Sequence, residues 1–210
     1  MKILCVSDQI DPLIYSDTIK QNYADVALIL SAGDLPMEYL EYIVNTLEKP
    51  LLFVFGNHQI DDHSKHKNEE SYIDAKVRYM EGLIIAGLGG SKRHNKGKSQ
   101  FTDFEMSIRI LKLIPALILN RIIRGRFADI LLTHAPPRGI HDRGIHDKKG
   151  KSHLGFKSFL WFMKAFKPRY LVHGQIHIYD PLEPRETKFH KTIVINAYGH
   201  YLIDTGKLSA

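Results

Sequence analysis

Leu51-Leu52-Phe53-Val54-Phe55-Gly56-Asn57-His58 joins a short apolar run to a glycine, an amide and an imidazole. A continuous apolar run of this length, which spans residues 51–55, predicts a strand that is buried on both faces. The same reading applies to seven other segments, at residues 2–6, 26–30, 83–88, 130–133, 170–172, 192–195 and 201–203.

Helical spacing of apolar residues occurs between these predicted strands. It predicts helices over residues 37–47, 103–123 and 156–166, with a break in the second at Pro115, where a backbone N–H is missing. Strands that alternate with helices indicate an α/β protein. At 210 residues with 44% hydrophobic content, the chain suits one domain over residues 1–210.

The composition excludes some classes of protein. Cys5 is the only cysteine and lies in an apolar run, so we expect a small core residue and a reducing, cytoplasmic setting. The apolar run that precedes Ser7 and Asp8 is too short for a signal peptide. No apolar stretch approaches the ~20 residues of a membrane-spanning helix. The net charge of +6 favours anionic partners without identifying them.

Polar residues follow five of the predicted strands directly. Because sites in α/β sheets form beyond the carboxyl ends of strands, we expect these five segments to converge. They are rich in carboxylate, amide and imidazole groups, which suit Mn²⁺, Fe or Zn²⁺, and two such ions can clamp a phosphate. Asp34 is the natural bridging carboxylate. The segments are Asp8, Gly33-Asp34, Gly56-Asn57-His58, Thr133-His134 and the run from His173 to His177.

This ordered series resembles the calcineurin-like metallophosphoesterases, whose motifs are D-x-H, G-D, G-N-H, a lone histidine and G-H-x-H. The resemblance spans nearly the whole chain and implies a four-layer α/β/β/α sandwich. It also implies that Asp8 and His177 hold one metal, that Asp34 bridges, and that Asn57 and His134 hold a second. The catalytic residue it implies is His58, which contacts the scissile phosphate and helps the leaving oxygen depart.

Two departures from the family pattern fall on metal ligands. Ile10 stands where D-x-H has its histidine, and Gln175 stands where G-H-x-H has its first histidine. Isoleucine cannot bind a metal, although Gln9 or Asp11 could reach in from a remodelled loop. Gln175 retains an oxygen donor, which favours Mn²⁺ or Mg²⁺ over Zn²⁺ or Fe. We therefore expect two divalent ions, Mn²⁺ first among them, with weak or single occupancy as an alternative.

Two further residues are predicted on the substrate side. Ser152 is interpreted as a helix N-cap, which would place His153 at a helix start that favours anions. Related phosphoesterases have a long loop after a similar Pro-Pro pair, which makes Arg138 the second candidate. The alternatives are a helix cap and a solvated arginine.

The resemblance predicts a hydrolase that cleaves a phosphomonoester or phosphodiester by attack of a metal-bound hydroxide. The alternative is a degenerate member that binds a phosphorylated ligand or one metal without efficient turnover. A third possibility is contact with nucleic acid or a membrane surface through residues 108–127, where cations interleave with Leu and Ile. The apolar positions of that segment more often indicate packing against the domain, or a contact in a homo-oligomer, than contact with lipid.

Overall fold

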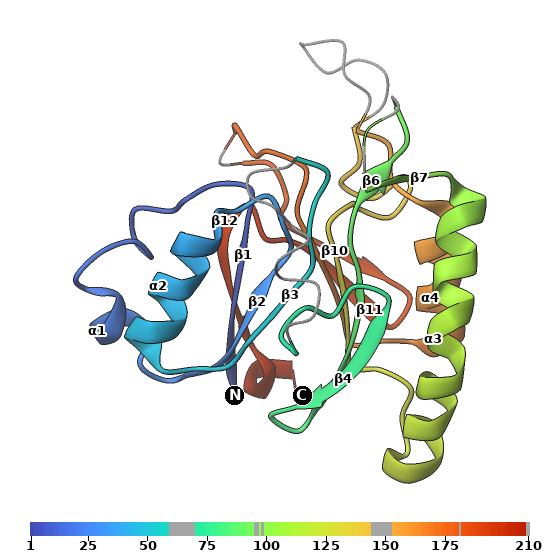
Figure 1. Cartoon of the computed structure of the whole chain (residues 1–210), viewed down its shortest axis with the longest axis horizontal. Helices are drawn as coiled ribbons and strands as arrows, with labels where there is room; N and C mark the ends of the chain where they lie inside the picture. Colours follow the sequence, from blue (N-terminus) through green and yellow to red (C-terminus); the bar gives the residue numbers. More distant parts are fainter. Residues whose placement is uncertain (59–69, 95–96, 98, 144–152, 181, 209–210) are drawn as a thin grey trace.

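The structure is a computed structural model that describes residues 1–58, 70–94, 97, 99–143, 153–180 and 182–208. Two β-sheets face each other, and helices cover the outer face of each (Figure 1). The fold is therefore a four-layer α/β/β/α sandwich, which confirms the fold class predicted from the sequence.

The first sheet has four strands in the order β12-β1-β2-β3. β1 is parallel to β2, β2 is parallel to β3, and the edge strand β12 is antiparallel to β1. The helices α1 and α2 cover its outer face. The bounds are β1 (Lys2–Ser7), β2 (Val26–Ser31), β3 (Leu51–Phe53), β12 (Gly199–Asp204), α1 (Ile19–Tyr23) and α2 (Met37–Leu47).

The second sheet has six strands in the order β10-β11-β9-β8-β5-β4, with four parallel strands between two antiparallel edges. α3 and α4 cover its outer face. The bounds are β4 (Lys76–Met80), β5 (Leu83–Leu88), β8 (Ile130–Thr133), β9 (Tyr170–His173), β10 (Glu186–Phe189), β11 (Thr192–Asn196), α3 (Asp103–Arg124) and α4 (Lys157–Phe166). The strands β6 (Ser91–Lys92) and β7 (Gln100–Phe101) form a separate pair, and a 3₁₀ helix spans Thr205–Leu208.

The main core lies between the two sheets. Ile3 and Leu30 of the first sheet pack with Ile85 and Leu132 of the second, and all four are fully buried. Cys5 belongs to this core, and burial raises the pKa of its thiol, so the prediction that it is a core residue is confirmed. The core fixes the two sheets against each other, so that loops from both sheets can share one site.

The predicted break at Pro115 is wrong, because α3 continues through it from Asp103 to Arg124. Pro115 is exposed, so the carbonyl that loses its N–H partner faces solvent, where water can satisfy it. Leu113 and Leu117 on the opposite face are buried, and their packing holds the helix together on both sides of the proline. No helix in the described part of the chain has the length and apolarity needed to cross a membrane.

Candidate metal centre

Three side chains from different strand ends meet at one edge of the two sheets. Asp8 follows β1, Asp34 follows β2, and His134 follows β8 of the other sheet. One ligand atom from each residue lies within 4.8 Å of the other two. Asp34 Oδ2 is 3.3 Å from His134 Nε2. The convergence predicted from the strand ends is therefore present for these three residues.

Glycines make this close approach possible. A Cβ atom on Gly56 would overlap the Asp34 carboxylate and the His134 ring, and one on Gly174 would overlap Asp8. Gly33 is constrained further, because its φ of 101° lies in a region that side chains avoid and a Cβ there would meet the backbone of Gly56. The motif glycines thus leave room for the polar groups that follow them.

Three of the candidate residues hold left-handed backbone conformations. The φ angles are 64° at Asp8, 57° at Asp34 and 65° at Gln175. Such angles are uncommon outside glycine, least so for Asp and Asn, and cost about 1–3 kcal/mol where they occur. The turns after β1, β2 and β9 therefore adopt a backbone conformation that the local sequence does not favour. Such conformations are common at functional sites.

Hydrogen bonds fix the direction in which the ligand atoms point. His134 Nδ1 lies 2.8 Å from the Ala32 carbonyl oxygen, to which it donates, so the lone pair of the neutral ring is on Nε2, facing Asp34. The backbone N–H of Gln175 donates to both carboxylate oxygens of Asp8, at 2.9 and 3.1 Å. The Ser7 hydroxyl donates to Asp8 as well. These groups are held in place before any ligand arrives.

Burial and the neighbouring charges shift the pKa values of all three residues in the cluster. Burial raises the pKa of Asp8. Burial also opposes ionisation of Asp34, but His134 and His58 outweigh it and lower the pKa of that carboxyl group. Burial works against a charged His134 too, yet Asp34 and Asp8 raise its pKa to about 9. A protonated His134 thus supplies the positive charge that the carboxylates require.

This charge arrangement predicts proton release on metal binding. The folded-state pKa of His134 lies above its ordinary value of 6.5, so its ion pair stabilises the metal-free fold fully below pH 6.5 and loses that effect as the pH rises through about 9. A metal on Nε2 needs the neutral ring. We expect Mn²⁺ binding near pH 7.5 to release about one proton from His134, measured by calorimetry in buffers of different ionisation enthalpy. Release that persists unchanged above pH 10 would contradict this assignment.

Three buried polar atoms in the described residues lack a hydrogen-bond partner at this place. They are Asn57 Oδ1, Gln175 Oε1 and, while the His134 ring is neutral, His134 Nε2. Buried polar groups without partners are costly, and such atoms are expected where a ligand or ion supplies the missing interaction. Together with two carboxylates they form a donor set of oxygen and imidazole nitrogen, which fits divalent ions. The residues present therefore fit a metal.

His58 and His177 lie at the open side of the cluster. The His58 side chain is 66% exposed, and its Nε2 is 4.0 Å from Asp34 Oδ2, while its backbone N–H donates to Asp34 Oδ1 at 3.2 Å. His177 is exposed and stacks on Tyr198, with ring centroids 4.9 Å apart. His177 lies outside the compact group that Asp8, Asp34 and His134 form.

The loop after β1 directs the Asp11 carboxylate to partners outside the cluster. Ile10 is 44% exposed. Asp11 Oδ2 lies 2.6 Å from His200 Nδ1, and Asp11 Oδ1 accepts the N–H of Leu13, so this carboxylate is held away from the cluster by its own partners. The possibility that Asp11 replaces the histidine is therefore not realised, and Gln9 is exposed.

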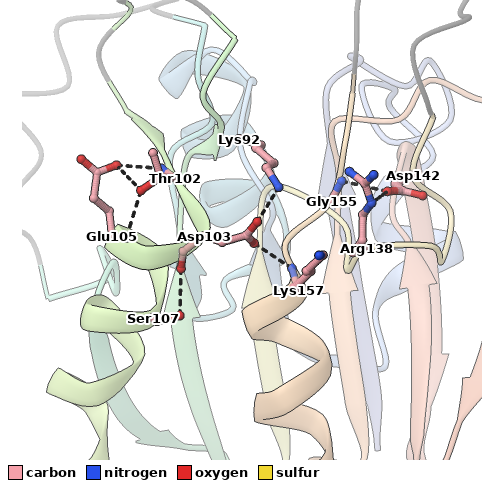
Figure 2. Close-up of polar contacts among 9 residues, drawn as sticks. All are labelled: Lys92, Thr102, Asp103, Glu105, Ser107, Arg138, Asp142, Gly155 and Lys157. Atoms are coloured by element: carbon pink, nitrogen blue, oxygen red, sulfur yellow. Dashed lines mark hydrogen bonds and ion pairs between the residues drawn. The ribbon is translucent and has the colours of Figure 1, made fainter.

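The two substrate-side candidates lie in paired segments after β8. Arg138 Nε is 3.7 Å from Asp142 Oδ2, and Asp142 accepts the N–H of Gly155 (Figure 2). The His153 carbonyl accepts the N–H of Arg143. The predicted helix start at His153 is wrong, because α4 begins at Lys157. Ser152 lies outside the described residues.

Figure 2 shows the contacts that fix the first turns of α3 and α4. Thr102 and Glu105 form a capping box at the first turn of α3. Asp103 accepts the backbone N–H of Lys157 at 2.9 Å and pairs with Lys92 at 2.5 Å. This carboxylate ties α3 to α4, a role that the sequence pattern did not reveal.

Sequence reasoning also missed several groups that support the site. Ser7 has no role in the sequence pattern beyond ending an apolar run, although its hydroxyl holds Asp8. The ring of His173 hydrogen-bonds to that of His141, which in turn reaches Thr187. Burial lowers the pKa of His173 to about 3, so this ring is neutral.

The four-layer fold and the Asp-Asp-His cluster together are typical of the metallophosphoesterase fold. The family model for calcineurin-like phosphoesterases matches residues 1–179. The chain therefore belongs to the calcineurin-like phosphoesterase family, whose members generally bind divalent metals and act on phosphate esters. No curated protein matches the chain.

Solved structures share this fold at low sequence identity. TT1561 of Thermus thermophilus has a TM-score of 0.63 and 12% identity, over 94% of this chain and 88% of that one. Phosphopantetheinyl hydrolase from Mycobacterium tuberculosis has a TM-score of 0.51 and 11% identity, also over 94% and 88%. A hypothetical protein from Thermus thermophilus has a TM-score of 0.51 and 13% identity, over 93% and 75%. At these identities the likeness concerns the fold alone.

Proposed function

We propose that the chain is a metal-dependent phosphoesterase that hydrolyses a phosphomonoester or phosphodiester. The observation that carries this proposal is the set of buried, unpartnered donor atoms of Asn57, His134 and Gln175 beside the carboxylates of Asp8 and Asp34. A site that had lost all metal binding would be under no constraint to keep these atoms buried and unpaired.

In this proposal the ligands divide between two positions. Asp8, Gln175 and His177 would hold one divalent ion, Asn57 and His134 would hold the other, and Asp34 would contribute its charge to both. When bound, the ions activate a water molecule and neutralise the phosphate during in-line displacement. Mn²⁺ fits this donor set best, because two of the donors are neutral amide oxygens.

His58 acts on the substrate in this arrangement. Its ring lies 4.0 Å from Asp34 and is 66% exposed, so it is next to the ions yet open to an incoming ester. It donates a hydrogen bond to the leaving oxygen and hands over a proton as the bond to phosphorus breaks. Arg138 and His153 are proposed to bind the substrate, on the segments that follow β8.

Metal content and turnover test the proposal together. Purified protein is analysed for its elements and then assayed after reconstitution with Mn²⁺, Mg²⁺, Zn²⁺ or Fe²⁺, using an aryl phosphate monoester and a bis-aryl diester as substrates. We expect metal-dependent hydrolysis of at least one of them. Bound metal without hydrolysis would favour the second candidate, a phosphate-ligand binding protein, which the loss of a ligand at Ile10 supports. Protein that neither retains a divalent metal nor hydrolyses either ester would defeat both.

The amide at position 175 gives a prediction about metal preference. We expect Gln175→His to raise the affinity for Zn²⁺ by roughly 10–100-fold, because imidazole replaces a weaker amide oxygen. The same gain is expected in the double variant Ile10→His/Gln175→His. Competition with a chromophoric chelator measures the affinity. If Mn²⁺ is the working ion, Mn²⁺-dependent turnover stays flat or falls in the double variant; if the site is merely weakened, Zn²⁺-dependent turnover rises.

The matched control for this prediction is Gln175→Ala, which removes the donor without replacing it. It should weaken Mn²⁺ binding, while the backbone N–H of residue 175 still holds Asp8. An unchanged Mn²⁺ affinity in Gln175→Ala would show that the Gln175 side chain is not a ligand.

A further inference from the structure

α3 has large apolar side chains on both faces, although only one face meets the sheet. Its buried face consists of Met106, Ile110, Leu113 and Leu117. The opposite face is exposed, from 39% at Ile108 to 76% at Ile122. We call this outward row the α3 stripe, and its members are Phe104, Ile108, Leu111, Ile118, Leu119, Ile122 and Ile123.

The α3 stripe lies on the outermost layer of the molecule. α3 runs along the outside of the second sheet, and its C-terminal turns extend beyond the strands in this view (Figure 1). α4 packs beside α3 and also has an exposed aromatic residue, Trp161, which is 48% exposed. A row of large exposed apolar side chains along one helix face indicates an interaction site.

The charges around the α3 stripe have one sign. Residues 106–128 contain five arginine or lysine residues and no aspartate or glutamate. Arg109 forms an ion pair with Asp74, and Arg126 forms one with Asp129. Lys112, Arg121 and Arg124 form no ion pair with a carboxylate in the described residues. The guanidinium carbon of Arg124 instead lies over the Tyr79 ring, 4.0 Å from its centroid.

We propose that the α3 stripe docks on the surface of an anionic phospholipid bilayer. Ile, Leu and Phe side chains would enter the boundary between headgroups and acyl chains, and the unpaired cations would meet lipid phosphates. A helix of 22 residues is about 33 Å long, so it can lie flat in the interface over its whole length. This inference is independent of the phosphoesterase activity and goes beyond it.

A second copy of the chain is the other occupant to consider. Apolar positions at 104, 108, 111, 115, 118 and 122 alternate in steps of four and three, a spacing that also suits paired helices. An antiparallel two-fold pair centred on the stripe would, however, bring Lys112 close to its own equivalent, because the two residues flank the same side of the contact. No acidic residue in 106–128 could neutralise that contact, so the charges favour an anionic lipid surface.

Vesicle flotation of the full chain tests the proposal. Vesicles of phosphatidylcholine alone are compared with vesicles that contain about 30% phosphatidylglycerol, at low and high salt. We expect binding to the anionic vesicles that weakens with salt. Leu119→Gln/Ile122→Gln should weaken the partition by roughly tenfold or more, because it removes inserted apolar groups. Lys112→Gln/Arg121→Gln should weaken it by roughly fivefold per charge and reduce its salt dependence.

The control is Leu13→Gln, which alters a 60% exposed leucine in the segment between β1 and α1, on the opposite outer layer. It should bind vesicles as the wild type does. Circular dichroism and thermal melting of each variant show whether the fold is kept. Absence of binding to anionic vesicles, or equal loss in the control, overturns the proposal. A stable dimer in light scattering that Leu119→Gln/Ile122→Gln dissociates also overturns it and assigns the stripe to a second copy.

Discussion

Asp34→Asn is expected to remove most of the bound metal and to lower phosphoesterase turnover by roughly a hundredfold or more. The substitution keeps the shape of the side chain, and its oxygen can still accept the backbone N–H of His58. It removes the negative charge that a bridging ligand contributes to both ions. It also removes the partner of His134 Nε2, at 3.3 Å, so the pKa of that imidazole should fall and metal-free protein should release less of the His134 proton on metal binding.

Elemental analysis and turnover of an aryl phosphate ester measure the two effects in one preparation. Asp129→Asn is the matched control, because it makes the same chemical change at a carboxylate beside the amino end of β8, where Asp129 accepts the N–H of Ile84 and pairs with Arg126. The control should keep wild-type metal content. If Asp34→Asn bound as much metal as this control, Asp34 would not be the bridging ligand.

The buried strands could be predicted from the sequence because they are apolar on both faces. The predicted segment at 83–88 matches β5, and 130–133 matches β8. The edge strands β4 and β10 were missed for the opposite reason: their residues are largely exposed or half-buried, so they lack a continuous apolar run. Hydrophobic pattern reports burial, and an edge strand is defined instead by its pairing.

The same distinction explains which site residues could be predicted. Asp8, Asp34 and His134 each follow a buried strand directly, so strand prediction alone placed them at one edge, and the structure brings them together. The contacts by which Ser7 and the backbone N–H of Gln175 hold Asp8 depend on backbone angles and on hydrogen bonds between segments far apart in the sequence. Such contacts leave no periodic signal in a single sequence. The helix start predicted at His153 is wrong because a serine that resembles a cap precedes it, while the helix begins only at Lys157.

His58→Ala is expected to keep its metal and to lower turnover by roughly 10²–10³, the usual effect of removing a positioned proton donor or charge stabiliser. The geometry gives the reason for this separation. The ring is 66% exposed and lies 4.0 Å from Asp34, whereas the donor atoms of Asn57 and His134 are buried. Removing the ring leaves the backbone N–H of residue 58 in place, so the hydrogen bond to Asp34 persists.

Metal stoichiometry and kcat, measured side by side, distinguish a catalytic role for His58 from a ligand role. His94→Ala is the control, since His94 is also exposed and lies at the β6–β7 pair, outside the cluster. A phosphate ester with a leaving group of low pKa needs little help from a proton donor, so the loss of kcat in His58→Ala should shrink with such a substrate. Loss of metal would make His58 a ligand. A loss of kcat that is the same for good and poor leaving groups would argue that His58 stabilises the phosphate charge and does not deliver a proton.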